Sequence, residues 1–277
     1  MRINGKEIQG AIREEVREAI ARDQRPLHLA VVSTGDDPVI RNFVTIKKRF
    51  AEDVGVIFSE KLFSRDVSAT TLKETLQELN NNPNITGIIV QLPLPSHLNT
   101  DSILEHISPS KDVDVLSSRA YALFTQGTSM ILPPVIGAIA EICKQHDITI
   151  KGCRVVILGN GRLVGAPAAV WFRARGGQVA IFDKLNPPPS DELQNADILV
   201  CGMGHARYIK PEMVKEKVIL FDAGTSESAG VIVGDVDPHC EAIAHIFTPV
   251  PGGIGPITVA IIFRNLIALG TKNQPAT

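Results

Sequence analysis

The chain has 277 residues and a formal net charge of −2, from 28 Lys and Arg against 30 Asp and Glu. Its length suits one large or two small domains with ample core. The near-neutral charge, without a long basic run, gives no reason to expect a nucleic-acid partner. We expect no membrane partner either, because the sequence holds no run of about eighteen apolar residues.

The four cysteines, Cys143, Cys153, Cys201 and Cys240, are far apart and show no C-x-x-C spacing. This pattern favours structural thiols in a reducing compartment over a zinc site, so no metal is expected. The segment Met1–Lys6 lacks the apolar core of a signal peptide, and we therefore expect a cytoplasmic location.

The first half of the chain alternates predicted helices and strands. Apolar residues recur every four positions at Ile8, Ile12, Val16 and Ile20, which places them on one helix face. Short apolar runs and helical patterns then alternate. The predicted strands are 27–33, 56–63 and 85–92, and the predicted helices are 39–53, 70–79 and 100–107. This alternation predicts a parallel sheet with right-handed crossovers, and hence an α/β fold.

The second half shows the same alternation. A helix that follows Pro133-Pro134 and ends near Gln145 leads into it. The proline-rich stretch 186–189 cannot form a helix and predicts a surface connection. The predicted strands are 155–158, 178–182, 198–201, 218–221 and 231–236, and the predicted helices are 166–174 and 257–269.

A glycine turn, Gly159-Asn160-Gly161, follows the apolar strand 155–158 and precedes a helix. Glycines let the backbone approach a phosphate, and a helix N-terminus offers free N–H groups and a partial positive charge. The turn therefore predicts either a dinucleotide pyrophosphate site or an ordinary strand-to-helix connection. The third glycine of G-x-G-x-x-G is displaced, because Val164 occupies that position and Gly165 comes one residue later.

Three polar side chains fall near the carboxyl ends of predicted strands, where open α/β sheets bind ligands. Lys47 lies in the helix after the first strand, Gln91 ends an apolar strand, and Asp114 follows the next helix. In an apolar cleft, a lysine and an amide can polarise a substrate and move a proton. Each residue also has an ordinary alternative: a solvated helix face, a strand end and a turn cap. From the residues alone, these three side chains define a candidate cleft and no more.

Five longer stretches carry a resemblance that covers nearly the whole chain. The chain resembles the bifunctional methylenetetrahydrofolate dehydrogenase/cyclohydrolase family, and the order Lys47, Gln91, Asp114 fits that family as well. The five stretches are Val90-Gln91-Leu92-Pro93-Leu94-Pro95, Lys111-Asp112-Val113-Asp114, Val164-Gly165-Ala166-Pro167, Gly234-Asp235-Val236, and the long irregular run from Thr248 to Ala260.

The resemblance implies an enzyme of one-carbon metabolism and purine biosynthesis. It oxidises 5,10-methylenetetrahydrofolate by hydride transfer to NAD or NADP, and then hydrolyses the methenyl cation to 10-formyltetrahydrofolate. The implied fold has a substrate domain over residues 1–130 and a Rossmann-like dinucleotide-binding domain over 131–255, with a cleft between them. The C-terminal helix 256–270 is expected to pack back on the substrate domain. A homodimer is also implied.

The resemblance further implies roles for single residues. Lys47 assists the cyclohydrolase step, Gln91 is its hydrogen-bonding partner, and Asp114 holds the pterin. The remaining implied substrate contacts are Phe43, Leu92, Pro93, Gly252, Gly253 and Pro256. The implied cofactor contacts are Gly159, Asn160, Gly161, Arg162, Gly165, Asp183, Lys184 and Thr225.

Several positions depart from the family pattern. Phe43 replaces a tyrosine, and Val115 stands where the family has a glycine. The stretch 132–135 replaces Pro-Cys-Thr-Pro, and 224–226 replaces Gly-Ile-Asn. All of these lie around the substrate or cofactor. They therefore leave two alternatives open, namely a paralogue that acts on another small substrate and a non-catalytic ligand-binding protein of the same fold.

The expected cofactor is NAD rather than NADP. Asn160-Gly161 stands where NADP-using members of the family carry Arg-Ser. Asp183 ends the second strand of this half, where an acid accepts a hydrogen bond from the ribose 2′-hydroxyl and repels a phosphate. Lys184 and Arg162 count in favour of NADP, and Asp183 has the alternative role of capping its own loop.

Overall fold

The structure is a computed structural model that describes residues 1–23, 26–228 and 231–272. The chain divides into two compact units. The first-half unit contains residues 11–134 and the part of the chain from 259 onward, and the second-half unit contains residues 1–10 and 135–258. The division falls inside the first and last helices, α1 (Gly5–Asp23) and α9 (Ile254–Lys272). The predicted domain boundaries at residues 130 and 255 stay predictions.

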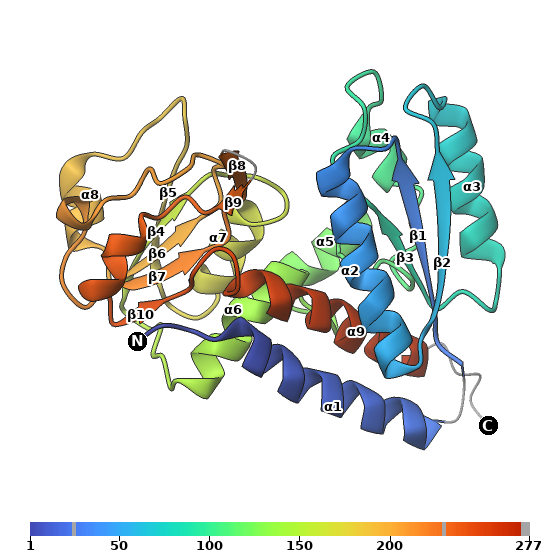
Figure 1. Ribbon diagram of the computed structural model, residues 1–277, viewed down its shortest axis with the longest axis horizontal. Helices are drawn as coiled ribbons and strands as arrows, with labels where there is room; N and C mark the ends of the chain where they lie inside the picture. Colours follow the sequence, from blue (N-terminus) through green and yellow to red (C-terminus); the bar gives the residue numbers. More distant parts are fainter. Residues whose placement is uncertain (24–25, 229–230, 273–277) are drawn as a thin grey trace. The chain divides into compact units, whose positions relative to one another are not determined.

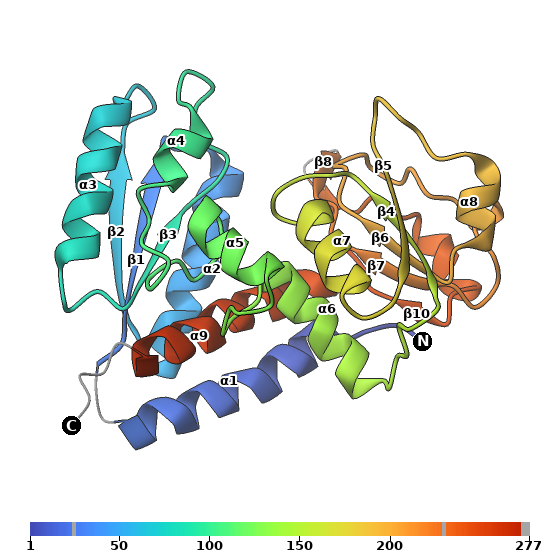
Figure 2. The same cartoon turned by 180° about the vertical axis from the view of Figure 1, so that it is seen from behind.

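The first-half unit is built on a parallel sheet, as the alternation predicts, and its strand order is β2-β1-β3. Its strands are β1 (His28–Thr34), β2 (Ile57–Phe63) and β3 (Gly87–Val90). Helix α2 (Pro38–Val54) lies on one face, while α3 (Ala69–Asn81) and α4 (Thr100–Leu104) lie on the other (Figures 1 and 2). Alternate strand residues face α3 and α4 and form one apolar cluster with them.

Helix α2 is fixed at both ends by its sequence. The Asp37 side chain accepts hydrogen bonds from the backbone N–H groups of Val39 and Ile40, and Pro38 occupies the first turn. Gly55 ends the helix in the left-handed conformation with φ of 80°. These caps set the helix start and end, and so fix where the side chains of its middle turns point.

The second-half unit contains a five-stranded parallel sheet in the order β10-β7-β6-β4-β5. From β4 the chain passes to β5 on one side and returns to β6 on the other, so the strand order reverses at β4. Ligands of open α/β sheets bind at such a point, outside the carboxyl ends of the strands. The strands are β4 (Arg154–Leu158), β5 (Gln178–Phe182), β6 (Ile198–Cys201), β7 (Ile219–Asp222) and β10 (Ile246–Phe247). The helices are α6 (Pro134–Gln145), α7 (Gly165–Arg173) and α8 (Ser190–Asn195).

The predicted strands and helices are confirmed within a few residues of their ends, but several short elements were missed. Among these are helices α5 (Ser118–Thr125) and α8, the short 3-10 helices Pro211–Met213 and Pro238–Ala242, strand β8 (Ser226–Ser228), which pairs antiparallel with β9 (Val231–Val233), and the two-residue strand β10. Each is too short for a hydrophobic period to develop, and β10 in addition depends on pairing with β7, which lies far earlier in the chain. The predicted strand 231–236 is correspondingly shorter, because it ends at Val233.

Among the described residues, α9 is the one helix long and apolar enough to cross a membrane, over Ile254–Thr271. Half of that window is buried inside the protein, which is typical of a core helix. Its apolar character is therefore weak evidence for a membrane span. In the first-half unit, Phe263 of α9 stacks on Phe50 of α2 with ring centroids 4.7 Å apart.

Candidate functional site

Lys47 and Gln91 meet on the α2 face of the first-half sheet. The Lys47 ammonium donates a hydrogen bond of 2.8 Å to Oε1 of Gln91. The Gln91 amide is 7% exposed, and its Nε2 donates to the backbone oxygen of Leu92 at 2.9 Å, which fixes which way the amide faces. The backbone N–H of Gln91 continues the sheet by donating to Val32. The strand end therefore holds a polar acceptor in place for the lysine.

Asp114 joins this pair from the loop that follows α4. Burial raises the pKa of the Asp114 carboxyl to about 6, while the Lys47 charge opposes the shift. Burial lowers the pKa of Lys47, and the Asp114 charge opposes that shift. The structure thus brings together the three residues that sequence reasoning alone could not connect. A lysine with a lowered pKa beside a carboxyl with a raised pKa is suited to proton transfer near neutral pH.

Val115, the residue after Asp114, has a backbone φ of 58° and is 3% exposed. This left-handed conformation is natural for glycine and costly for a β-branched side chain. The observation gives a physical reason for the glycine that the resemblance leads one to expect at this position. In this chain Val115 adopts the left-handed conformation that suits glycine, and it adds a buried side chain to the loop.

The other predicted substrate residues of this unit lie close by in sequence. Phe43 is one helical turn before Lys47 on α2 and is half-buried. Leu92 is half-buried and Pro93 is exposed, directly after the strand that carries Gln91. The Leu92–Pro93 peptide bond is cis.

The predicted glycine loop of the second-half unit packs tightly against the start of the chain. The backbone N–H of Gly5 donates to the oxygen of Gly252 at 2.9 Å, and a Cβ on Gly5 would lie 1.9 Å from the oxygen of Gly253. Gly252 itself has a φ of 103°. The backbone oxygen of Pro256 accepts a hydrogen bond of 2.8 Å from Gln9. Glycine is therefore required here for close contact between two backbones.

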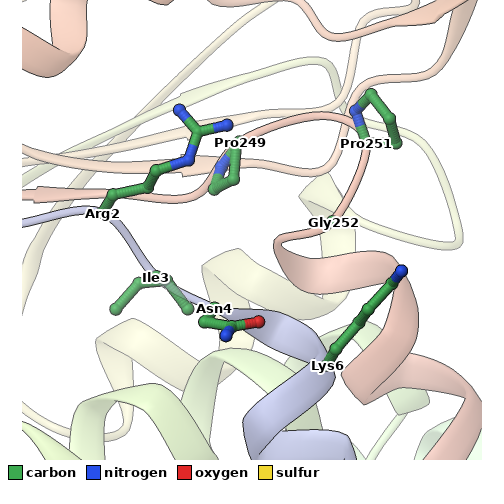
Figure 3. A pocket seen from close by; sticks show the side chains of 7 residues that line it. All are labelled: Arg2, Ile3, Asn4, Lys6, Pro249, Pro251 and Gly252. Atoms are coloured by element: carbon green, nitrogen blue, oxygen red, sulfur yellow. The ribbon is translucent and has the colours of Figure 1, made fainter.

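A surface pocket of about 300 Å³ opens beside this loop (Figure 3). Two cationic side chains, from Arg2 and Lys6, lie at its edge, and Arg2 forms an ion pair with Glu241. Its lining residues are Arg2, Ile3, Asn4, Lys6, Pro249, Pro251 and Gly252.

The glycine turn after β4 is packed so closely that two of its glycines leave no room for a side chain. Gly159 has a φ of 93°, and a Cβ there would lie 2.5 Å from the backbone oxygen of Gly202. A Cβ on Gly165 would lie 1.7 Å from the oxygen of Gly159, so the displaced glycine allows α7 to start against the turn. Val164, at the N-cap of α7, supplies no side-chain hydrogen bond to the first turn. Asn160 is exposed, as are the two residues that follow it.

Asp183, at the end of β5, caps its own loop. Its Oδ1 accepts hydrogen bonds of 2.9 Å from the backbone N–H groups of Leu185 and Asn186. The structure thus shows the capping role that we considered as an alternative, and both bonds go to the same carboxylate oxygen. Lys184, next in the chain, is exposed, and so is Thr225 at the other side of the sheet's carboxyl edge.

Two buried carboxylates, neither of them predicted as a site residue, organise this edge. Asp235 is fully buried and accepts hydrogen bonds from the backbone N–H groups of residues 203–205. Asp222 is 1% exposed and accepts from the N–H groups of Gly224, Asp235 and Val236. Burial raises the pKa of Asp222 to about 7 against these hydrogen bonds. A signal was present, because Asp222 ends a strand that is otherwise wholly apolar.

No group of three or more His, Cys, Asp or Glu residues that could hold a metal ion occurs in the part of the chain that the structure describes. All four cysteines are free thiols. Burial raises the pKa of Cys143 and Cys240 to about 12, so these thiols stay protonated and unreactive at neutral pH.

Two α/β units, one in which a lysine, a buried amide and a carboxyl come together and one with a dinucleotide-type glycine turn, define a nucleotide-dependent enzyme. The family model of the tetrahydrofolate dehydrogenase/cyclohydrolase NAD(P)-binding domain matches residues 133–274, and that of the catalytic domain matches residues 3–114. The chain belongs to the tetrahydrofolate dehydrogenase/cyclohydrolase family.

Individual relatives agree over the whole length. A bifunctional protein FolD from Nitratiruptor sp. is 34% identical over 277 residues, covering 98% of each chain. The crystal structure of the Campylobacter jejuni FolD dehydrogenase/cyclohydrolase has a TM-score of 0.94 at 30% identity and covers 99% of each chain. The Trypanosoma brucei FolD structure, complexed with NADP and an inhibitor, has a TM-score of 0.94 at 27% identity, covering 98% of this chain and 97% of that one.

These findings confirm the predicted family, the two-domain α/β fold and the predicted activity. The protein is a methylenetetrahydrofolate dehydrogenase/cyclohydrolase that uses a nicotinamide cofactor. A divergent paralogue with another substrate and a non-catalytic binding protein are not favoured.

Proposed function

We propose that Lys47, Gln91 and Asp114 form the reacting end of the folate site. The observation that carries this proposal is the 2.8 Å hydrogen bond from Lys47 to a buried amide, beside a carboxyl with a raised pKa. Ionised Asp114 accepts hydrogen bonds from the N–H groups of the pterin and so orients the ring. Phe43 offers an aromatic face for stacking without the hydroxyl of a tyrosine, and Leu92 and Pro93 complete the site in this unit.

Lys47 is the proton partner of the hydrolysis. Water adds to the methenyl carbon, and neutral Lys47 takes the proton that the water loses. The carbon–N5 bond then breaks, the ammonium of Lys47 returns the proton to N5, and the hydroxyl on the former methenyl carbon releases its proton to solvent as it becomes the carbonyl of the formyl group on N10. A lysine with a lowered pKa can perform both transfers. Gln91 holds the amine in line by accepting its hydrogen bond.

The glycine turn is the proposed site of the cofactor pyrophosphate, because glycines at 159 and 165 let the turn and the start of α7 pack backbone against backbone, which places the first N–H groups of the helix at the turn. Gly161, Asn160 and Arg162 are the further cofactor contacts on this turn. When bound, the nicotinamide accepts the hydride of the oxidation. Gly252, Gly253 and Pro256 remain the predicted substrate contacts of the second-half unit.

NAD is the cofactor that we propose over NADP. Asn160-Gly161 supplies neither a cation nor a hydroxyl for a 2′-phosphate. The Asp183 carboxylate is held at the end of β5 by two backbone N–H groups, where it repels a phosphate on the ribose. Lys184 and Thr225 are exposed and are assigned as outer cofactor contacts.

One assay tests these assignments. Purified protein is mixed with methylenetetrahydrofolate and either NAD or NADP, and the absorbance of the methenyl product is followed. We expect a higher kcat/KM with NAD, and an equal or lower value would contradict the cofactor assignment.

Lys47→Met should abolish hydrolysis of added methenyltetrahydrofolate and leave cofactor binding intact. Lys48→Met is the matched control, since Lys48 is exposed and pairs with Glu52. Unchanged hydrolysis in Lys47→Met would remove its role.

We further propose that the protein is a cytoplasmic homodimer that binds a tetrahydrofolate derivative. Light scattering coupled to size-exclusion chromatography measures the oligomeric state, and a mass of one chain would contradict the dimer.

A further inference from the structure

Helix α9 carries a buried asparagine whose side-chain amide donates hydrogen bonds to loop backbone. Asn265 is 5% exposed. Its Nδ2 donates two hydrogen bonds, one of 2.9 Å to the oxygen of Val113 and one of 2.8 Å to the oxygen of Leu132. All three residues belong to the first-half unit. A buried amide with both N–H groups engaged binds two carbonyls at fixed directions.

Val113 directly precedes Asp114, so this bond acts on the peptide next to the carboxyl. The rest of the loop is held elsewhere. The oxygen of Lys111 accepts from the N–H of Ile88, and the buried Asp112 carboxylate accepts from the N–H of Ser117 at 2.7 Å. The hydrogen bond from Asn265 to the oxygen of Val113 therefore holds the part of the loop between Lys111 and Ser117.

The loop needs an external anchor because its backbone is strained at the next residue. Val115 has a φ of 58°, a conformation that a β-branched residue keeps only where surrounding contacts impose it. Without the bond to Val113, the loop can relax this strain by turning the adjoining peptides. Such a turn would move the Asp114 carboxyl relative to Lys47.

We infer that Asn265 is a positioning residue of the folate site: its two hydrogen bonds hold the loop so that Asp114 faces Lys47 and the pterin. This inference rests on the proposed role of Asp114. Asparagine fits the position because leucine, of similar size, has no donor, and aspartate would place oxygens against two carbonyls.

The test is a kinetic comparison of Asn265→Leu with a matched control, Asn80→Leu. Asn80 also uses its side chain for two bonds to backbone, with His106 and Ser108, in the same unit. Asn265→Leu should raise the KM for methylenetetrahydrofolate about tenfold, change kcat less than threefold and leave the cofactor KM unchanged. Asn80→Leu should lower the melting temperature without changing the folate KM. If Asn265→Leu fails to fold, Asn265→Asp at pH 8 carries the same expectation.

A double variant separates positioning from general destabilisation. If Asn265 acts through Asp114, then Asn265→Leu should add less than a twofold rise in KM to Asp114→Asn. An equal rise in both backgrounds would overturn the inference, as would an unchanged KM in Asn265→Leu or an equal rise in Asn80→Leu. Full hydrolysis by Lys47→Met would instead overturn the proposed function, so the two failures are distinguishable.

Discussion

The Asp114 carboxyl shows how neighbouring charges and burial set the chemistry of a single residue. Burial raises its pKa, the buried Asp112 adds to that shift, and Lys47 opposes both. Lys47 in turn is shifted the other way by burial. The two shifts narrow the gap between an acid and a base that would otherwise differ by several pKa units. These pKa shifts could not be predicted from the sequence, in which the lysine and the aspartate are 67 positions apart.

The pKa of about 6 gives a prediction for substrate binding. Asp114 must be ionised to accept hydrogen bonds from the pterin, so protonation below pH 6 should weaken folate binding. We expect kcat/KM for methylenetetrahydrofolate to fall about tenfold for each pH unit below 6, while cofactor binding stays constant. Asp114→Asn should remove this acid limb. If kcat/KM of Asp114→Asn still falls below pH 6, the titrating group is a residue other than Asp114.

At the scale of elements, the long strands and helices were predictable and the contacts between them were not. The strand 178–182 was placed at its observed ends because an apolar run between turn residues suffices to define it. Strand β8 is only three residues long, and strand β10 depends on its pairing with β7, which lies far earlier in the chain. Lys47 was placed on a helix, but its bond to Gln91 across 44 positions required the fold.

The same contrast holds for the glycine turn. Its sequence differs from G-x-G-x-x-G by one position, which left an ordinary connection as an alternative. The structure shows the physical requirement, since a side chain at Gly165 would collide with the oxygen of Gly159. The motif G-x-G-x-x-G describes only the spacing of glycines in the sequence. The fold requires that the backbone of the turn and the backbone at the start of α7 can approach closely, and a glycine one position later meets this requirement.

This turn gives a prediction at the scale of the strand–turn–helix element. Gly165→Ala should weaken cofactor binding at least tenfold, because the added Cβ forces α7 away from the turn. Hydrolysis of methenyltetrahydrofolate, which consumes no cofactor, should persist. Gly10→Ala is the matched control, as a Cβ at Gly10 meets nothing within 4 Å. Tight cofactor binding by Gly165→Ala, measured by calorimetry, would show that the turn does not hold the nucleotide.

For the molecule as a whole, Asp222 links folding stability to pH. Its pKa is raised from 3.8 to about 7, first because it is buried and then because Asp235 adds negative charge. Between these two values the folded state holds a proton that the unfolded chain has released. The contribution of Asp222 to stability is therefore fully present below pH 4 and is lost as the pH rises through 7.

Thermal unfolding at a series of pH values measures this linkage. Between pH 5 and pH 8 we expect the melting temperature of the wild-type protein to fall by several degrees. Asp222→Asn should flatten that dependence, because it carries no titrating proton. It should also lower stability throughout by about 1–3 kcal/mol, since its amide cannot accept all three backbone hydrogen bonds. The Asp114→Asn variant, measured in parallel, shows how much of the pH dependence of the melting temperature comes from Asp114, whose pKa is also raised. An identical pH dependence in the wild-type protein and Asp222→Asn would show that Asp222 is ionised at neutral pH and that its three hydrogen bonds outweigh burial.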